Sequence, residues 1–148
     1  MTDQFLTEAQ VADFRCIAGM IIPASAEYGV PGADDAVIFA DILASIGRDF
    51  GEISAALAQA VELAGGAVVA LDVERRAVVA GRLQAEGGAG MAVLVRVVLL
   101  CYYRDDRVMV SLGLEPRAPF PKGHVLEQGD WSLLDQVKAR KPFWRAAS

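Results

Sequence analysis

The single histidine, His124, is the side chain best suited to act as a general base near neutral pH. A serine or cysteine nucleophile that depends on histidine would have to meet it. His124 lies in the stretch GLEPRAPFPKGHV (113–125), which also contains Pro116, Pro119 and Pro121. Proline fixes φ and lacks a backbone donor, so this stretch is predicted to run extended. We therefore interpret His124 as an exposed or partner-facing imidazole rather than a catalytic base.

The chain lacks the sequence motifs that usually accompany metal binding, redox chemistry and nucleotide binding. The chain has no CxxC motif and no cluster of His and Cys at metal-ligand spacing. The glycines of GGAGMAV (87–93) lack the third glycine of a dinucleotide loop and follow a helical stretch. Cys16 and Cys101 both lie in apolar runs, where a free thiol behaves as a small hydrophobe, with a disulfide between them as the alternative. We expect no catalytic residue and no cofactor or metal of the chain's own.

The composition describes one domain over residues 1–148 with a surplus of apolar side chains. The hydrophobic share is 54%, against roughly 45–50% in ordinary soluble domains. The formal net charge is −5 and no basic stripe alternates with aromatic residues, which argues against nucleic acid as a partner. The longest apolar run, 91–103, falls short of the ~20 residues of a membrane span. Part of the apolar surplus is therefore available for a protein partner.

The N-terminal region resembles a signal peptide only in part. The apolar run CIAGMIIPASA (16–26) has the right character, but Asp3, Glu8 and Asp13 precede it, whereas a secretory n-region is positively charged. We therefore expect a cytoplasmic protein. A periplasmic location is the alternative, if the chain is exported together with a partner that carries a signal.

Apolar periodicity, caps and breakers predict an all-α bundle of five to six helices. Residues 1–6 are expected to be disordered and 113–129 to be extended, while 106–113 form a short helical turn. The apolar run near Cys101 is expected to be a central helix packed on every side. The predicted helices cover about 8–22, 35–46, 51–64, 73–86, 89–104 and 130–141.

Two isolated charges in apolar helices suggest an internal ion pair. Arg96 is the single charge in the most apolar predicted helix, and Asp41 is the single charge in VIFADIL. Because an unpaired buried ion costs several kcal/mol, Arg96 and Asp41 are predicted to pair. Glu62 or a carboxylate of a partner protein would form the ion pair with Arg96 equally well.

Three stretches resemble the small subunit of the gluconate 2-dehydrogenase type, also called subunit 3. They are IIPASAEYGVPGADDAVIFADIL (21–43), CYYRDDRVMVSLGLEPRAPFPKGH (101–124) and the closing KPFWR (141–145). Sequences of that family contain, in order, an IIP element, a PGA loop, two tyrosines before DPRV, then LG, RPPFP and a terminal WR motif. Here Asp106 and Ala118 each replace a proline of that pattern, and the family's usual export signal is absent.

The resemblance implies a non-catalytic small subunit that binds and stabilises a large FAD-dependent glucose-methanol-choline-type oxidoreductase acting on sugars or alcohols. In that family the FAD and the chemistry belong to the large subunit, and the small one is thought to act as a chaperone or in delivery. The alternative is an independent small helical enzyme or ligand-binding domain with a pocket at Tyr102, Tyr103, Arg107 and His124. The expected partner interface comprises Tyr102, Tyr103, Arg107, Pro119, Phe120, Pro121, His124, Phe143 and Trp144.

Overall fold

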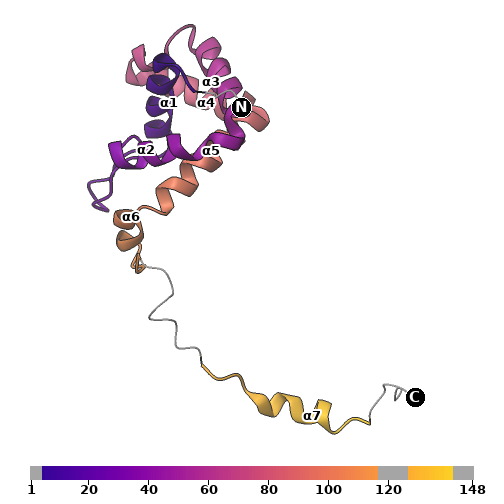
Figure 1. Ribbon diagram of the computed structural model, residues 1–148. Helices are drawn as coiled ribbons and strands as arrows, with labels where there is room; N and C mark the ends of the chain where they lie inside the picture. Colours follow the sequence, from indigo (N-terminus) through magenta and orange to yellow (C-terminus); the bar gives the residue numbers. More distant parts are fainter. Residues whose placement is uncertain (1–4, 117–126, 142–148) are drawn as a thin grey trace. The chain divides into compact units, whose positions relative to one another are not determined.

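The computed structural model describes residues 5–116 and 127–141 (Figure 1). The chain divides into two compact units, Met1–Pro116 and Arg117–Ser148. The prediction of one domain over 1–148 stays a prediction. Within the described residues the structure is helical without a strand, which confirms the all-α class.

The described residues contain seven α-helices, more than the predicted five to six, together with three short 3-10 helices. The turn predicted at 106–113 is a helix of its own, and only the middle of the predicted helix over 130–141 is helical. The α-helices are α1 (Glu8–Ile21), α2 (Ala36–Ser45), α3 (Phe50–Ala64), α4 (Val73–Glu86), α5 (Gly88–Tyr103), α6 (Asp106–Ser111) and α7 (Asp135–Lys138). The 3-10 helices are η1 (Gly47–Asp49), η2 (Val68–Ala70) and η3 (Trp131–Leu134).

Side-chain caps explain where the helices begin. At α1 the hydroxyl of Thr7 accepts from the backbone N–H of Gln10, and the Gln10 side chain accepts from the backbone N–H of Thr7, which together form a capping box. Asp35, Asp72 and Asp105 accept backbone N–H groups at the starts of α2, α4 and α6. These short acceptors satisfy donors that no intrahelical carbonyl can reach.

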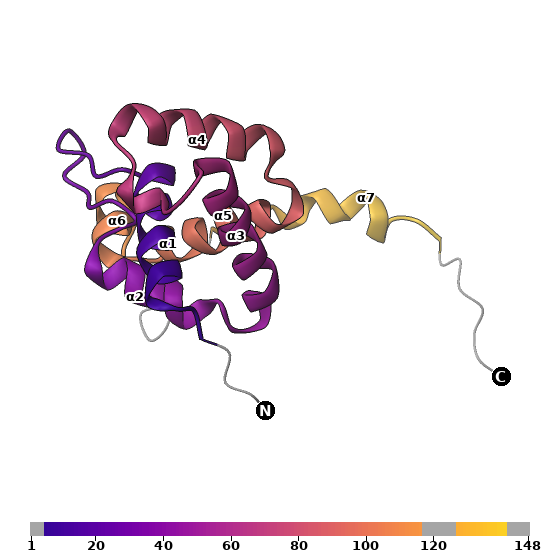
Figure 2. The same cartoon turned by 90° about the horizontal axis from the view of Figure 1, so that it is seen from above.

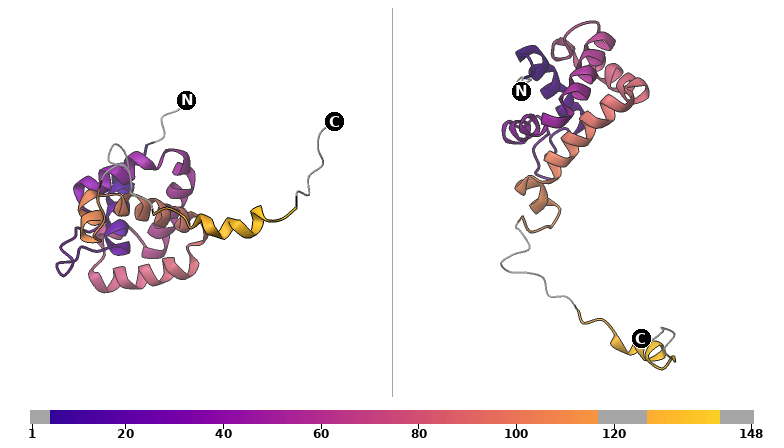
Figure 3. Two further views of the ribbon diagram at one scale, coloured as in Figure 1. Left: turned by 90° about the horizontal axis from the view of Figure 1, so that it is seen from below. Right: turned by 45° about the vertical axis from the view of Figure 1, so that its right-hand side comes forward.

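The core of the first unit forms around α5, which lies alongside α3 and also packs on α2, α1, α4 and α6 (Figure 3). Leu94 and Val98 on α5 and Ile53 and Leu57 on α3 are almost completely buried. Helix α4 lies along one edge of the unit (Figure 2). Leu6, which falls in the segment predicted to be disordered, packs against this core.

Helix α5 is not packed on every side, contrary to the prediction. Its residues 96, 99, 100 and 103 share one helical face, and that face is open to solvent. Leu100 is 58% exposed and Tyr103 is 53% exposed. The run 91–103 therefore contains more apolar side chains than this unit buries.

One stretch of the described residues, Gly47–Ala70, is long and apolar enough to cross a membrane by length and composition. Helices α4 and α5 meet the same criteria only as a pair bent by 114°. Because Ile53, Ala56, Leu57 and Ala60 of α3 are buried in the helical core, we describe α3 as a core helix.

A buried carboxylate that the sequence analysis did not single out joins α1 to η2. Asp13 is only 3% exposed, and its Oδ1 accepts a hydrogen bond from the Val69 amide at 2.9 Å. This bond satisfies a carboxylate oxygen inside the fold and fixes η2 against α1.

Candidate functional site

The stretches 21–43 and 101–116 meet at a junction between α2, α5 and α6. Tyr102, near the end of α5, donates its hydroxyl hydrogen to the carbonyl oxygen of Pro31 at 3.1 Å. The ring is 4% exposed, and burial raises the pKa of its phenol. We call the residues that join the two stretches here the α2–α6 junction: Pro31, Asp35, Asp41, Tyr102, Arg104, Asp105 and Arg107.

Arg107 connects the N-terminal caps of two helices within the α2–α6 junction. Its Nη2 lies 2.7 Å from Oδ1 of Asp35 and 3.0 Å from Oδ2 of Asp105. Hydrogen bonds from Arg107 hold the pKa of both carboxyls below the ordinary range and raise the pKa of the guanidinium itself. One side chain thereby fixes the start of α6 against the start of α2.

A second arginine of the α2–α6 junction binds Asp41 through two nitrogens. Nε and Nη2 of Arg104 each lie 2.6 Å from a different oxygen of Asp41, and Nη2 also donates to Ser45 at 2.7 Å. The hydrogen bonds from Arg104 lower the pKa of Asp41. Such a two-point arginine–carboxylate contact fixes orientation as well as charge.

The predicted pair of Arg96 with Asp41 is wrong. Arg96 instead binds Asp49 at the end of η1, with 2.7 Å between Nη2 and Oδ2. Eight residues separate Arg96 from Arg104, a distance of about 12 Å along a helix, and α2 presents Asp41 to the far end of α5. The Arg96 side chain is 41% exposed, so it also points partly outward from the helix.

A cavity of about 470 Å³ lies beside these ion pairs, lined by residues of α2, α5 and α6. Of the four residues in the predicted ligand pocket, Arg107 lines it. The Tyr102 hydroxyl is hydrogen-bonded to the Pro31 carbonyl, Tyr103 is exposed, and His124 lies outside the described residues. Each arginine here already binds a carboxylate, so the junction is suited to holding helices together rather than to polarising a substrate.

Next to the α2–α6 junction, α5 exposes a face of apolar side chains. Tyr103 stacks edge-on against Tyr102, with ring centroids 5.3 Å apart, while most of its own surface faces solvent. Leu99 and Leu100 lie one turn earlier on the same face of α5. We call these three residues the Tyr103 face. The sequence signal for it was the apolar surplus of the run 91–103.

The predicted interface residues therefore have different outcomes. Tyr103 is exposed and remains available to a partner, and Arg107 is half-exposed but engaged in ion pairs. Tyr102 belongs to the core, so its predicted place in the interface is corrected: the hydrogen bond to Pro31 draws the ring inward. The remaining six lie outside the described residues: Pro119, Phe120, Pro121, His124, Phe143 and Trp144.

Both cysteines are free thiols. Cys101 is buried near Ser45 and Asp41, and Cys16 is half-buried on α1. Burial is the main cause that raises the pKa of each thiol. Within residues 5–116 and 127–141, no group of three or more His, Cys, Asp or Glu side chains could hold a metal ion.

Comparisons with known proteins give no match, so the functional argument is based on the fold and the α2–α6 junction. No protein-family model, no curated protein and no solved structure matches the chain.

Proposed function

We propose that the chain is a non-catalytic small subunit that binds and stabilises a large FAD-dependent oxidoreductase of the glucose-methanol-choline type, acting on sugars or alcohols. In this proposal the flavin and the substrate chemistry reside on the large subunit. The small subunit contributes binding surface and assists folding or delivery. The proposal rests on the resemblance of three stretches of sequence to the gluconate 2-dehydrogenase small subunit.

The α2–α6 junction is the observation that carries the proposal. Residues from two of the three resembling stretches converge there through Tyr102 with Pro31, Arg107 with Asp35, and Arg104 with Asp41. These two stretches are far apart in the sequence. A resemblance that arose by chance would not require them to lie side by side in the fold. Their contact supports treating the resembling residues as one structural unit.

The Tyr103 face supports a partner-binding role. Tyrosine is enriched at the centres of protein interfaces, and the two leucines on the same helical face add exposed apolar surface beside Tyr103. Leu112 and Leu114, which follow at and after the end of α6, are also more than half exposed. Clustered apolar exposure of this kind marks interaction surfaces more often than isolated apolar residues do.

Affinity purification tests the proposal. The tagged chain is co-expressed with the reading frames that neighbour it in its genome, and the eluate is examined for a co-purifying protein with flavin absorbance. We expect Tyr103→Ser to reduce the yield of that protein at least tenfold, while the isolated chain loses only the stability of its ring contact with Tyr102, about 0.5–1.5 kcal/mol. Val78→Ser, at an apolar residue on α4 that is more exposed than Tyr103, is the control and should leave the yield unchanged.

Phe120 lies outside the described residues and is tested in the same way. We expect Phe120→Ala to weaken co-purification at least tenfold, since a preorganised aromatic anchor contributes about 2 kcal/mol or more. Earlier unfolding with intact binding would instead place Phe120 in the chain's own core. Flavin absorbance or sugar oxidation by the purified chain alone would contradict the non-catalytic role.

A further inference from the structure

The helical segment of the second unit, η3 followed by α7, exposes an apolar face. Trp131, Leu134 and Val137 follow one another at intervals of three residues, and residues three apart share a face in both 3-10 and α-helices. Leu133, four residues before Val137, lies beside them. Trp131 is 66% exposed and Leu133 is 74% exposed. We call these four residues the Trp131 face.

The segment that carries the Trp131 face has no buried core of its own, since every residue of the described range 127–141 is exposed. The helices η3 and α7 have four residues each, whereas isolated helices shorter than ~12–15 residues are marginal in water. The Asp130 side chain accepts from the Ser132 N–H at 3.0 Å, and the Trp131 indole N–H donates to Gln128 at 3.2 Å. A surface that takes up the four apolar side chains would therefore stabilise the segment.

The charges of the chain are unevenly distributed along its sequence. Residues 1–116 contain eight arginines, no lysine and sixteen Asp and Glu, a formal charge of −8. Residues 117–148 contain six Lys and Arg against three Asp and Glu, a formal charge of +3. Lys138, Arg140 and Lys141 directly follow the Trp131 face in the sequence. The apolar face is thus next to cations, which favours an anionic surface as its cover.

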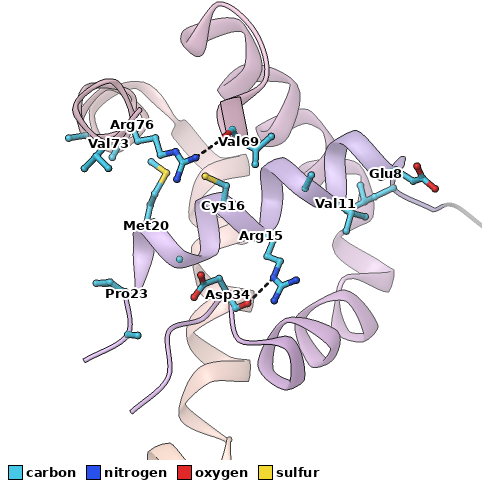
Figure 4. A pocket seen from close by; sticks show the side chains of 16 residues that line it. Glu8, Val11, Arg15, Cys16, Met20, Pro23, Asp34, Val69, Val73 and Arg76 are labelled. Atoms are coloured by element: carbon cyan, nitrogen blue, oxygen red, sulfur yellow. Dashed lines mark hydrogen bonds between the residues drawn. The ribbon is translucent and has the colours of Figure 1, made fainter. Parts of the chain in front are cut away.

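The cations of the first unit are already engaged within the chain. Six of its arginines form ion pairs with Asp or Glu: Arg48, Arg75, Arg82, Arg96, Arg104 and Arg107. The other two, Arg15 and Arg76, donate to backbone carbonyls beside a cavity that they help to line (Figure 4). The side chains of Arg140 and Lys141, by contrast, have no ion pair or hydrogen bond with another described residue. These two cations are therefore available to an external anion.

We propose that the Trp131 face, together with Lys138, Arg140 and Lys141, binds an anionic phospholipid surface. The segment would lie in the plane of the headgroups, with its apolar side chains below them and the three cations among the phosphates. A tryptophan indole suits this boundary, and long cationic side chains reach the headgroups while their methylenes stay among the acyl chains. Lys138 can do so because its pair with Asp135, at 3.6 Å, is exposed. The helical segment is far shorter than the ~20 residues of a bilayer span, so it lies on the surface.

A lipid surface fits these observations better than a protein pocket does. The apolar side chains form a short strip, which a fluid headgroup boundary accepts without a preformed cavity. Each Lys or Arg near such a surface adds an attraction that salt screens. The whole chain carries −5, so its overall charge repels it from anionic lipid and attachment has to come from this segment. The inference goes beyond the proposed function, which concerns the large subunit.

Vesicle binding by the full chain tests the proposal. Trp131 and Trp144 are the two tryptophans of the chain, so Trp144→Phe leaves Trp131 as the sole indole reporter. Its fluorescence should shift to shorter wavelength with vesicles of phosphatidylcholine that contain phosphatidylserine, and binding should be at least tenfold tighter than to phosphatidylcholine alone. NaCl at about 0.5 M should remove this preference. Equal binding to both kinds of vesicle, or binding to neither, would overturn the proposal.

A pair of double variants tests the apolar contact. Leu134→Ser combined with Val137→Ser should weaken binding to the anionic vesicles at least tenfold, and both side chains are exposed, so the helical core of the first unit is untouched. Val73→Ser combined with Val78→Ser is the matched control, at two valines of α4 that are 76% and 65% exposed. The control should bind as the unchanged chain does, and equal losses in the two variants would overturn the proposal.

A pair of triple variants tests the charges. Lys138→Gln, Arg140→Gln and Lys141→Gln together should remove the preference for anionic vesicles. The control removes the same charge from three exposed arginines of the first unit and should keep the preference: Arg48→Gln, Arg75→Gln and Arg82→Gln. If the chain binds no vesicles, but Leu134→Ser with Val137→Ser lowers the yield of a co-purified flavoprotein or abolishes a concentration-dependent dimer, the Trp131 face belongs to a protein interface and the proposal is wrong.

Discussion

Arg107 and Asp35 are separated by 72 positions in the sequence, yet Nη2 of the arginine lies 2.7 Å from Oδ1 of the aspartate. The same aspartate oxygen accepts the Val37 amide at the start of α2. Arg107 meanwhile contacts Asp105, which caps α6. A single guanidinium therefore determines how α6 continues from the helical core.

We expect Arg107→Gln to lower the free energy of unfolding by about 1 kcal/mol. Half-exposed ion pairs are typically worth about 0.2–1 kcal/mol, and here two carboxylates lose their shared partner. Urea denaturation measures the change, and a double-mutant cycle with Asp35→Asn isolates the coupling. Arg75→Gln removes a more exposed pair with Asp72 and should cost less than about 0.5 kcal/mol. A coupling of zero would mean that the pair contributes nothing to stability and would contradict the prediction.

The junction also makes stability depend on pH. Arginine partners hold the pKa of Asp35, Asp41 and Asp105 below the ordinary range. A carboxyl whose folded pKa is lowered stabilises the fold above its unfolded pKa, about 3.9, and this contribution is lost as pH falls through the folded pKa. We therefore expect the urea midpoint to fall as the pH drops below about 4. The decline should be shallower in Arg107→Gln, and parallel curves for the two proteins would contradict this assignment.

Much of the fold follows from local sequence patterns. The capping box of Thr7 and Gln10 and the aspartates at positions 35 and 72 mark helix starts that differ from the predictions by a residue or less. These signals are short-range, because each cap acts on amides within three residues. The breaker Pro23 likewise sets the end of α1.

The ion pairs could not be assigned in the same way. Arg96 lies on α5 and Arg104 caps its end about two turns later, and the sequence does not specify which of them faces Asp41. That choice depends on where α2 crosses α5, a tertiary relationship without a local signal.

Two glycines near the end of α4 should respond oppositely to alanine. Gly81 lies inside the helix and a Cβ there would meet nothing within 4 Å, so Gly81→Ala should stabilise the chain by about 0.5–1 kcal/mol. At Gly87 a Cβ would lie 2.6 Å from Cβ of Met91 and would also crowd the Leu83 carbonyl. Gly87→Ala should therefore destabilise it by about 1–3 kcal/mol. Thermal unfolding followed by circular dichroism compares both, and equal shifts would show that α5 does not begin against α4 as described.

The two thiols should differ in reactivity with dithiobis(nitrobenzoate). Cys16 is half-buried on α1, whereas Cys101 is 2% exposed beneath α2. The native chain should therefore release one equivalent of thiolate readily and the second only in denaturant. Because burial raises the pKa of both thiols, the rate at Cys16 should keep rising above the ordinary cysteine pKa of about 8.5.

Serine variants assign the two phases of that reaction. Cys16→Ser should remove the fast phase, and Cys101→Ser should leave it unchanged. Rapid labelling of Cys101 in the native chain would show that α5 opens from α2 despite the contact between Arg104 and Asp41.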